Sequence, residues 1–141
     1  MASRRVDRAA FLTSLIGQPW RPDRNCWDVA ALVQWKLFRR KLPHVHIPDN
    51  APARWLMATL AEHPERAKWV KHEEAFPGLL TAPDGALVGM ARVERAVHIG
   101  VWIAPERKVI HCDEVGGVCF DEVPRLRANG WGRVEFYIPE T

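Results

Sequence analysis

The sequence predicts an α+β fold in which N-terminal helices pack on a C-terminal antiparallel β-sheet. Apolar residues at helical spacing dominate the first half of the chain, whereas short β-rich runs between turn residues fill the part after residue 85. Helices followed by a meander of strands are typical of the α+β class. A length of 141 residues suits one domain over residues 1–141.

Two helices are predicted near the N-terminus. The first covers about residues 5–16, and the proline-containing segment Gly17–Trp20 ends it. Asn25 is a suitable N-cap for a second helix over residues 26–41, which Pro43 terminates. Three basic residues at the C-terminal end of this second helix complement its dipole.

A further helical region is predicted over residues 52–75, and turn signals follow at residues 77–78 and 83–85. Five short strands come next, separated by turn residues at hairpin spacing. We predict them at residues 86–90, 96–103, 108–112, 117–120 and 132–138.

Composition excludes several classes of protein. No apolar stretch is long enough for a membrane span, and the N-terminus lacks the apolar region of a secretory signal, so we expect synthesis in the cytoplasm. The net charge of +3 comes from scattered basic residues, which suits an anionic polymer such as a cell wall and does not indicate a nucleic-acid partner. Seven tryptophans predict either a large aromatic core or a groove lined by indoles.

Cys26 falls at the first turn of the second predicted helix. Unpaired N–H groups and the helix dipole at such a position favour a thiolate, and they can hold an oxyanion during acyl transfer. Cys26 also lies on the apolar stripe of that helix. Its position alone therefore fits a buried small residue slightly better than a nucleophile.

Two histidines in the strand half shift that balance. His98 and Gly100 share one face of the predicted strand at 96–103, and His111 lies in the next strand. A loop of two or four residues would put the histidines on the same face, opposite or one diagonal step apart, whereas three residues would separate them. In the first case His111 is placed to orient His98 as a base for Cys26. Gly100 would leave open space there. Ordinary structural roles for both histidines are the alternative.

A metal site is a weaker interpretation of the residues around His111. Cys112, Asp113 and Cys119 offer further ligands, but adjacent histidine and cysteine residues on a strand point to opposite faces, and no Cys-x-x-Cys pair occurs. We therefore predict no metal and no cofactor. An odd number of cysteines, three, also argues against a full disulfide framework.

In order and spacing, these motifs resemble the NlpC/P60 family of papain-like cell-wall peptidases, especially its phage-tail type. The family's Gly-x-Pro-Tyr/Trp corresponds to Gly17–Trp20, and its Asp-Cys-Trp-Gly-Leu-Val helix start corresponds to residues 25–33. Its Gly-Asp-Leu-Val is similar to residues 84–88. Its His-Val-Gly-Ile-Tyr strand is similar to residues 98–102, and a third polar residue corresponds to His111. The likeness covers about residues 17–138.

The resemblance implies a papain-like fold and a cysteine peptidase or amidase that cleaves peptide stems of bacterial peptidoglycan, often at the γ-D-glutamyl bond. It makes Cys26 the nucleophile, His98 the base and His111 the orienting residue. Trp20 stands where the family often has a tyrosine near the oxyanion site. A phage-tail relative would be virion-associated and would have tail proteins as partners.

The chain departs from the family pattern around the cysteine. Asn25 replaces an aspartate, and Trp27-Asp28 replaces Trp-Gly or Ser-Gly, so we place Trp27 and Asp28 beside the substrate together with Trp20 and Gly100. Asp28 would narrow the groove or repel an acidic stem peptide. Two other functions stay open: a non-catalytic tail assembly or interaction protein on the same fold, and an acyltransferase or deamidase acting on another amide substrate.

Overall fold

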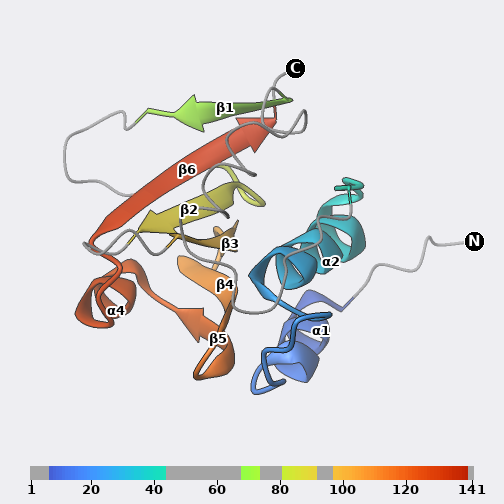
Figure 1. The fold of residues 1–141 in the computed structure, drawn as a ribbon. Coiled ribbons are helices and arrows are strands. Elements are labelled where there is room, and N and C mark those ends of the chain that lie inside the picture. The colour runs from blue at the N-terminus through green and yellow to red at the C-terminus, as the bar shows by residue number, and fades with distance from the viewer. Residues whose placement is uncertain (1–6, 44–67, 74–80, 92–96, 140–141) are drawn as a thin grey trace, which may run out of the picture.

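The protein is α+β, with a six-stranded antiparallel sheet and three helices among the residues that the structure describes. The structure is a computed structural model, and it describes residues 7–43, 68–73, 81–91 and 97–139. Helices α1 and α2 lie together beside the sheet, and α4 lies apart from them (Figure 1). The elements are α1 (Arg8–Leu15), α2 (Cys26–Phe38), β1 (Trp69–His72), β2 (Leu87–Ala91), β3 (Val97–Ile103), β4 (Lys108–Asp113), β5 (Gly117–Asp121), α4 (Val123–Ala128) and β6 (Arg133–Pro139).

Helix α2 begins where the sequence predicts, because Asn25 forms a complete capping box. The Asn25 side chain accepts a hydrogen bond from the Asp28 backbone N–H at 3.1 Å, and the Asp28 carboxylate accepts one from the Asn25 N–H at 3.1 Å. The Asn25 amide also donates to the Pro22 carbonyl at 3.1 Å. Since Asn25 is only 1% exposed, these bonds are shielded from water and fix the position of Cys26.

Replacing Asn25 with alanine is expected to lower the free energy of unfolding by about 1–2 kcal/mol, because it removes the helix cap and a buried hydrogen bond. Urea denaturation followed by circular dichroism measures this change. Asn25→Ser keeps an acceptor for the Asp28 N–H and should retain most of the stability. Equal losses for the two variants would show that the cap contributes little.

Helix α2 ends at Phe38, three residues earlier than predicted. Arg39 adopts the left-handed conformation, with φ 56°, and its N–H closes the helix on the Gln34 carbonyl. The next residue, Arg40, turns back and donates to the Gln34 side chain at 3.2 Å and to the Gly85 carbonyl at 2.9 Å. These tertiary bonds to a buried amide and to a turn end the helix before Pro43 is reached.

The predicted helix over residues 52–75 is wrong at residues 69–72, which form strand β1. This strand pairs antiparallel with β6, from Trp69 opposite Pro139 to His72 opposite Phe136. The ladder to β6 overrides the local helical pattern, because pairing satisfies the backbone groups of both strands. Residue 68, in a 3-10 turn, and residue 73, which has no regular structure, are not α-helical either. The remainder of that predicted helix, residues 52–67 and 74–75, lies outside the described residues.

The five predicted strands are present within one or two residues at each end, and they form a continuous sheet with β1. The strand order is β1-β6-β2-β3-β4-β5, with antiparallel pairing throughout. Helix α4 was not predicted, because six residues are too few to show helical periodicity. At the β5 edge the backbone of Gly17 and Gln18 hydrogen-bonds Val118, which covers part of that edge.

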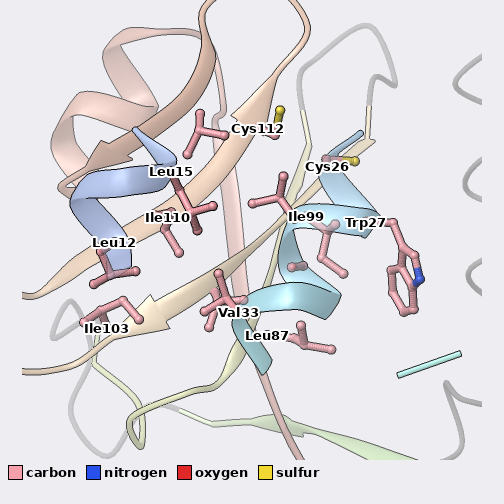
Figure 2. Close-up of a cluster of buried hydrophobic side chains, with 14 of the residues drawn as sticks. Leu12, Leu15, Cys26, Trp27, Val33, Leu87, Ile99, Ile103, Ile110 and Cys112 are labelled. Atoms are coloured by element: carbon pink, nitrogen blue, oxygen red, sulfur yellow. The ribbon is translucent and has the colours of Figure 1, made fainter. Parts of the chain in front are cut away.

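The two faces of the sheet carry separate cores. On one face, apolar residues of α1 and α2 pack on Ile99, Ile110 and Cys112 (Figure 2). On the other face, residues of α4 and the segment after it pack on Trp102 and neighbouring strand residues. Successive residues along β3, and likewise along β4, therefore point to opposite faces of the sheet. This alternation decides on which face each candidate catalytic side chain lies.

Candidate active site

His98 and His111 form a buried hydrogen-bonded pair on the face of the sheet that α4 covers. His98 Nε2 lies 2.9 Å from His111 Nδ1, and the two residues are 6% and 2% exposed. Strands β3 and β4 are joined by a four-residue loop, residues 104–107, and Gly100 pairs with His111. The histidines are therefore one diagonal step apart on the same face, which confirms the register predicted for an even-numbered loop.

Asp121 continues this pair on the next strand. The Asp121 carboxylate lies 2.9 Å from His111 Nε2, and 19% of its side chain is exposed. Sequence reasoning missed Asp121, although the signal was present. A three-residue turn at residues 114–116 pairs Asp113 with Gly117, and the same register brings Asp121 opposite Val109, two residues from His111.

The three groups fix the positions of their protons. A carboxylate only accepts hydrogen bonds, so His111 carries its proton on Nε2 and donates it to Asp121. When His111 is neutral, its Nδ1 is an acceptor, and His98 donates to it from Nε2. In neutral His98 the remaining nitrogen, Nδ1, therefore holds a basic lone pair. The relay Asp121–His111–His98 thus orients one imidazole as a proton acceptor.

Trp131 packs against the His98 end of this relay. Its ring stacks on the His98 ring, with centroids 4.8 Å apart and planes 14° from parallel, and Trp131 is 5% exposed. Trp131 follows α4, and Gly130 before it adopts a positive φ of 97°. Sequence reasoning assigned this tryptophan no role, because only the tertiary fold brings the end of α4 onto β3. The indole restricts the His98 ring and shields it from water.

Cys26 occupies the first position of α2 and packs in the core on the opposite face of the sheet (Figure 2). The backbone of Ile99 lowers the pKa of the Cys26 thiol and so acts on its sulfur. Ile99 follows His98 in the chain, and it lies beyond the β3–β4 ladder, which starts at Gly100 paired with His111. The Cys26 thiol packs in the same core cluster as Ile99, the residue that follows His98, near the point where β3 and β4 cease to pair.

Burial dominates the electrostatics of Cys26. Desolvation raises the pKa of the Cys26 thiol to about 12, and the Ile99 backbone opposes this rise only in part. The neighbouring Cys112 and Asp28 raise the pKa further. At neutral pH the resting thiol is thus protonated, and it requires a base before it can act as a nucleophile.

The other residues predicted for the site near Cys26 are Trp20, Trp27 and Asp28, and each has a different environment in the structure. Trp20 is half-buried and packs at the edge of the α2-side core. Trp27 is 5% exposed and belongs to the α2-side core, and its indole N–H donates to the Pro43 carbonyl at 2.9 Å. Asp28 has a structural role, because its carboxylate completes the capping box of α2.

The open space predicted beside Gly100 is absent. A Cβ atom at Gly100 would lie 2.7 Å from a Val109 methyl group, 2.8 Å from the Ile110 carbonyl oxygen and 3.0 Å from the His111 Cβ. Glycine is required here because β3 and β4 approach closely, which brings His111 within hydrogen-bond reach of His98.

A pocket of roughly 500 Å³ opens along α2, beside Asp28 and Trp35. Its lining includes Arg24 and Lys41 and does not include Cys26 or either histidine of the relay. Its lining is mostly apolar and includes Trp35, which is 46% exposed, together with charged side chains of both signs. It is distinct from the relay on the other face of the sheet.

The fold and the site define the class of protein as α+β, with helices α1 and α2 against one face of an antiparallel sheet and a histidine relay on the other face. No protein-family model matches the chain, and no curated protein matches its sequence. In the part of the chain that the structure describes, no helix is long and apolar enough to cross a membrane.

Proposed function

We propose that this protein is a cysteine-dependent amide hydrolase with a papain-like arrangement of the NlpC/P60 type. The observation that carries the proposal is the relay from Asp121 through His111 to His98, whose hydrogen bonds leave His98 Nδ1 as the proton acceptor. The packing of Cys26 in one cluster with Ile99 supports it, because Ile99 is the residue that follows His98 in β3.

In the proposed reaction, a rotation of the Cys26 side chain around the end of the β3–β4 ladder first brings the thiol to His98. His98 Nδ1 then takes the thiol proton as the sulfur attacks the substrate carbonyl. The negative charge of the tetrahedral intermediate moves to the carbonyl oxygen, where N–H groups of the first turn of α2 stabilise it. The imidazolium of His98 then gives its proton to the leaving amine, and the C–N bond breaks to form a thioester. A water molecule, deprotonated by His98, hydrolyses this thioester and restores the thiol.

The raised pKa of Cys26 decides which variant of this mechanism applies. Because burial raises the pKa of the thiol to about 12, a preformed thiolate–imidazolium pair is disfavoured. Proton transfer to His98 therefore accompanies attack, as in serine hydrolases. Asp121 and His111 act by positioning His98 and by stabilising the imidazolium that forms.

The proposed substrate is a peptide stem of bacterial peptidoglycan. The motifs around Cys26, His98 and His111 support this choice through their likeness to the cell-wall peptidases. The net charge of +3 favours association with an anionic polymer.

Digestion of purified peptidoglycan by the wild-type protein and by Cys26→Ala, read by mass spectrometry, tests the proposal. The wild type is expected to release new stem-peptide fragments, whereas Cys26→Ala should release none, since it lacks the nucleophile. Cys112→Ala is the matched control, because Cys112 is also a buried thiol on the α2 side of the sheet. It should keep the activity.

Two results of that digestion would contradict the proposal. If the wild type releases no fragments, peptidoglycan is not the substrate. If Cys26→Ala releases fragments, Cys26 is not the nucleophile. Intact-protein mass spectrometry of the wild type adds a direct measure, because a thioester increases the mass by that of the acyl group. Transfer of that group to an added amine instead of water would indicate an acyltransferase.

One observation favours a second candidate function, a non-catalytic interaction protein on the same fold. Cys26 is 6% exposed, and its raised pKa makes it inert as a resting thiol. Under this alternative the relay only stabilises the sheet, and neither fragments nor a thioester form. Phage-tail proteins would then be the partners, and pull-down with assembled tails would replace digestion as the positive test.

A further inference from the structure

A second set of chemically active side chains lies at the outer end of the relay. His111 Nε2, Cys119 Sγ and a carboxylate oxygen of Asp121 all lie within 4.8 Å of one another. Cys119 is the direct cross-strand partner of His111, and Asp121 follows it by two residues on the same face of β5. The mechanism proposed above does not use Cys119.

These three groups form a ligand set suited to zinc. Imidazole, thiolate and carboxylate are its usual protein ligands, and three of them leave a fourth tetrahedral position for water. A tetrahedral zinc ion needs ligand atoms about 3.4–3.6 Å apart. The three atoms lie within 4.8 Å of one another, so a rotation of the Cys119 side chain must close the set, while the 2.9 Å contact between His111 Nε2 and Asp121 widens. Such a rotation gives up only a weak hydrogen bond from the Cys119 thiol to the Gly117 carbonyl, at 3.4 Å.

The site is accessible from solvent. Cys119 is partly exposed, and 19% of the Asp121 side chain is exposed, whereas His111 is buried behind them at 2%. An ion therefore meets the thiol and the carboxylate first, and it reaches the imidazole last. The sequence suggested Cys112 and Asp113 as further ligands, but Cys112 packs in the core on the opposite face.

We propose that His111, Cys119 and Asp121 bind a zinc-type divalent cation, and that this cation switches off His98 by reversing the tautomers of the relay. Without the ion, His111 donates from Nε2 to Asp121. The ion takes the lone pair of His111 Nε2, so the proton of that imidazole must move to Nδ1. His111 then donates to His98 Nε2, and His98 carries its proton on Nδ1.

The proton count of this switch is simple. Both histidines stay neutral, with one proton each before and after binding, and the protons change only their positions. Cys119 gives up its thiol proton to solvent when its sulfur binds the ion, so one proton is released for each ion bound. With a proton on Nδ1, His98 is no longer able to accept the proton of Cys26.

Cobalt(II) binding tests the metal site without any enzymatic assay. In a Cys26→Ser background, we expect tetrahedral Co²⁺ absorption together with a thiolate-to-metal charge-transfer band. Adding Cys119→Ser should remove that band and weaken Co²⁺ binding by at least about tenfold. The matched control adds Cys112→Ala in place of Cys119→Ser, and it should leave the band unchanged. No band in the background variant, or a band that survives Cys119→Ser, would overturn the site.

Two further measurements test the switch. Long-range ¹⁵N–¹H NMR of histidine rings should show His98 and His111 changing from the Nε2–H to the Nδ1–H tautomer when Zn²⁺ is added. Zn²⁺ should also inhibit hydrolysis by the wild type, and a chelator should restore the rate. In Cys119→Ser, Zn²⁺ should inhibit less, so the rate with Zn²⁺ divided by the rate without it should rise toward one. Binding with unchanged tautomers would overturn the switch.

The inhibition rests on the proposed function, whereas binding and the tautomer change do not. If the wild type hydrolyses nothing, the absorption and NMR measurements still decide on the metal site. If hydrolysis is present but insensitive to bound Zn²⁺, the switch fails and the proposed hydrolase stands.

Discussion

The His98→Ala variant is expected to hydrolyse the substrate about 10²–10⁴ times more slowly than the wild type, measured as kcat/KM at pH 7. The reason is the state of Cys26. Its pKa is raised to about 12, so almost all of the thiol is protonated at neutral pH. Loss of His98 removes the base that the relay from Asp121 and His111 orients.

The activity that remains in His98→Ala should rise with pH. Only the thiolate reacts without the base, and its fraction increases about tenfold per pH unit below a pKa of about 12. This rise in residual activity can be measured up to about pH 9. Above the pKa of an unfolded cysteine, about 8.5, the unfolded chain releases a proton that the folded Cys26 retains, so higher pH lowers stability.

The control for this variant is His72→Ala. His72 is a partly exposed residue of β1, which lies three strands from β3 in the sheet, and its loss should leave hydrolysis within about twofold. Wild-type rates in His98→Ala, or residual activity that does not change between pH 7 and 9, would show that another group takes the proton of Cys26.

Replacing Gly100 with alanine is the second change with a large expected effect. The new methyl group would lie 2.7 Å from Val109 and 2.8 Å from the Ile110 carbonyl oxygen. The Ile110 carbonyl belongs to the backbone and cannot rotate away as a side chain can. We therefore expect the free energy of unfolding to fall by about 3 kcal/mol, which is the upper end of the usual cost of overpacking a core. The strands must also separate, which moves His111 from His98. A displacement near 1 Å should lower kcat/KM about 100-fold in the protein that remains folded.

Gly132→Ala provides the matched control, because a Cβ at Gly132 meets no atom within 4 Å and its φ is not positive. Its stability should stay within about 0.5 kcal/mol of the wild type. Denaturation followed by tryptophan fluorescence gives the stabilities, and digestion of peptidoglycan gives the rates. A Gly100→Ala protein as stable and active as Gly132→Ala would mean that β3 and β4 tolerate wider spacing.

Much of the fold is predictable because its signals are local. Asn25 is predicted as a cap from its residue type alone, and Gly117 adopts the positive φ of 72° that glycine permits at a turn. The parity rule for hairpins also puts His98 and His111 on one face once the loop between their strands has an even number of residues. These signals depend on a few neighbouring residues, so a single sequence contains them.

Other features depend on contacts between distant parts of the chain. Strand β1 forms because Trp69–His72 meets β6, some seventy residues later in the chain, and its own residues favour a helix equally well. The early end of α2 follows from the bond of Arg40 to Gly85. No periodicity in the sequence reports such partners.

The sequence by itself determined the α+β class, the start of α2 at Cys26 and the shared face of His98 and His111. Only the tertiary structure decided that Asp121 completes the relay, that Trp131 stacks on His98 and that Cys26 carries a raised pKa. The physical reason is the separation along the chain between the groups that interact. Caps and hairpin register arise from hydrogen bonds between near neighbours, whereas desolvation, ring stacking and the convergence of polar groups depend on how the two faces of the sheet are covered.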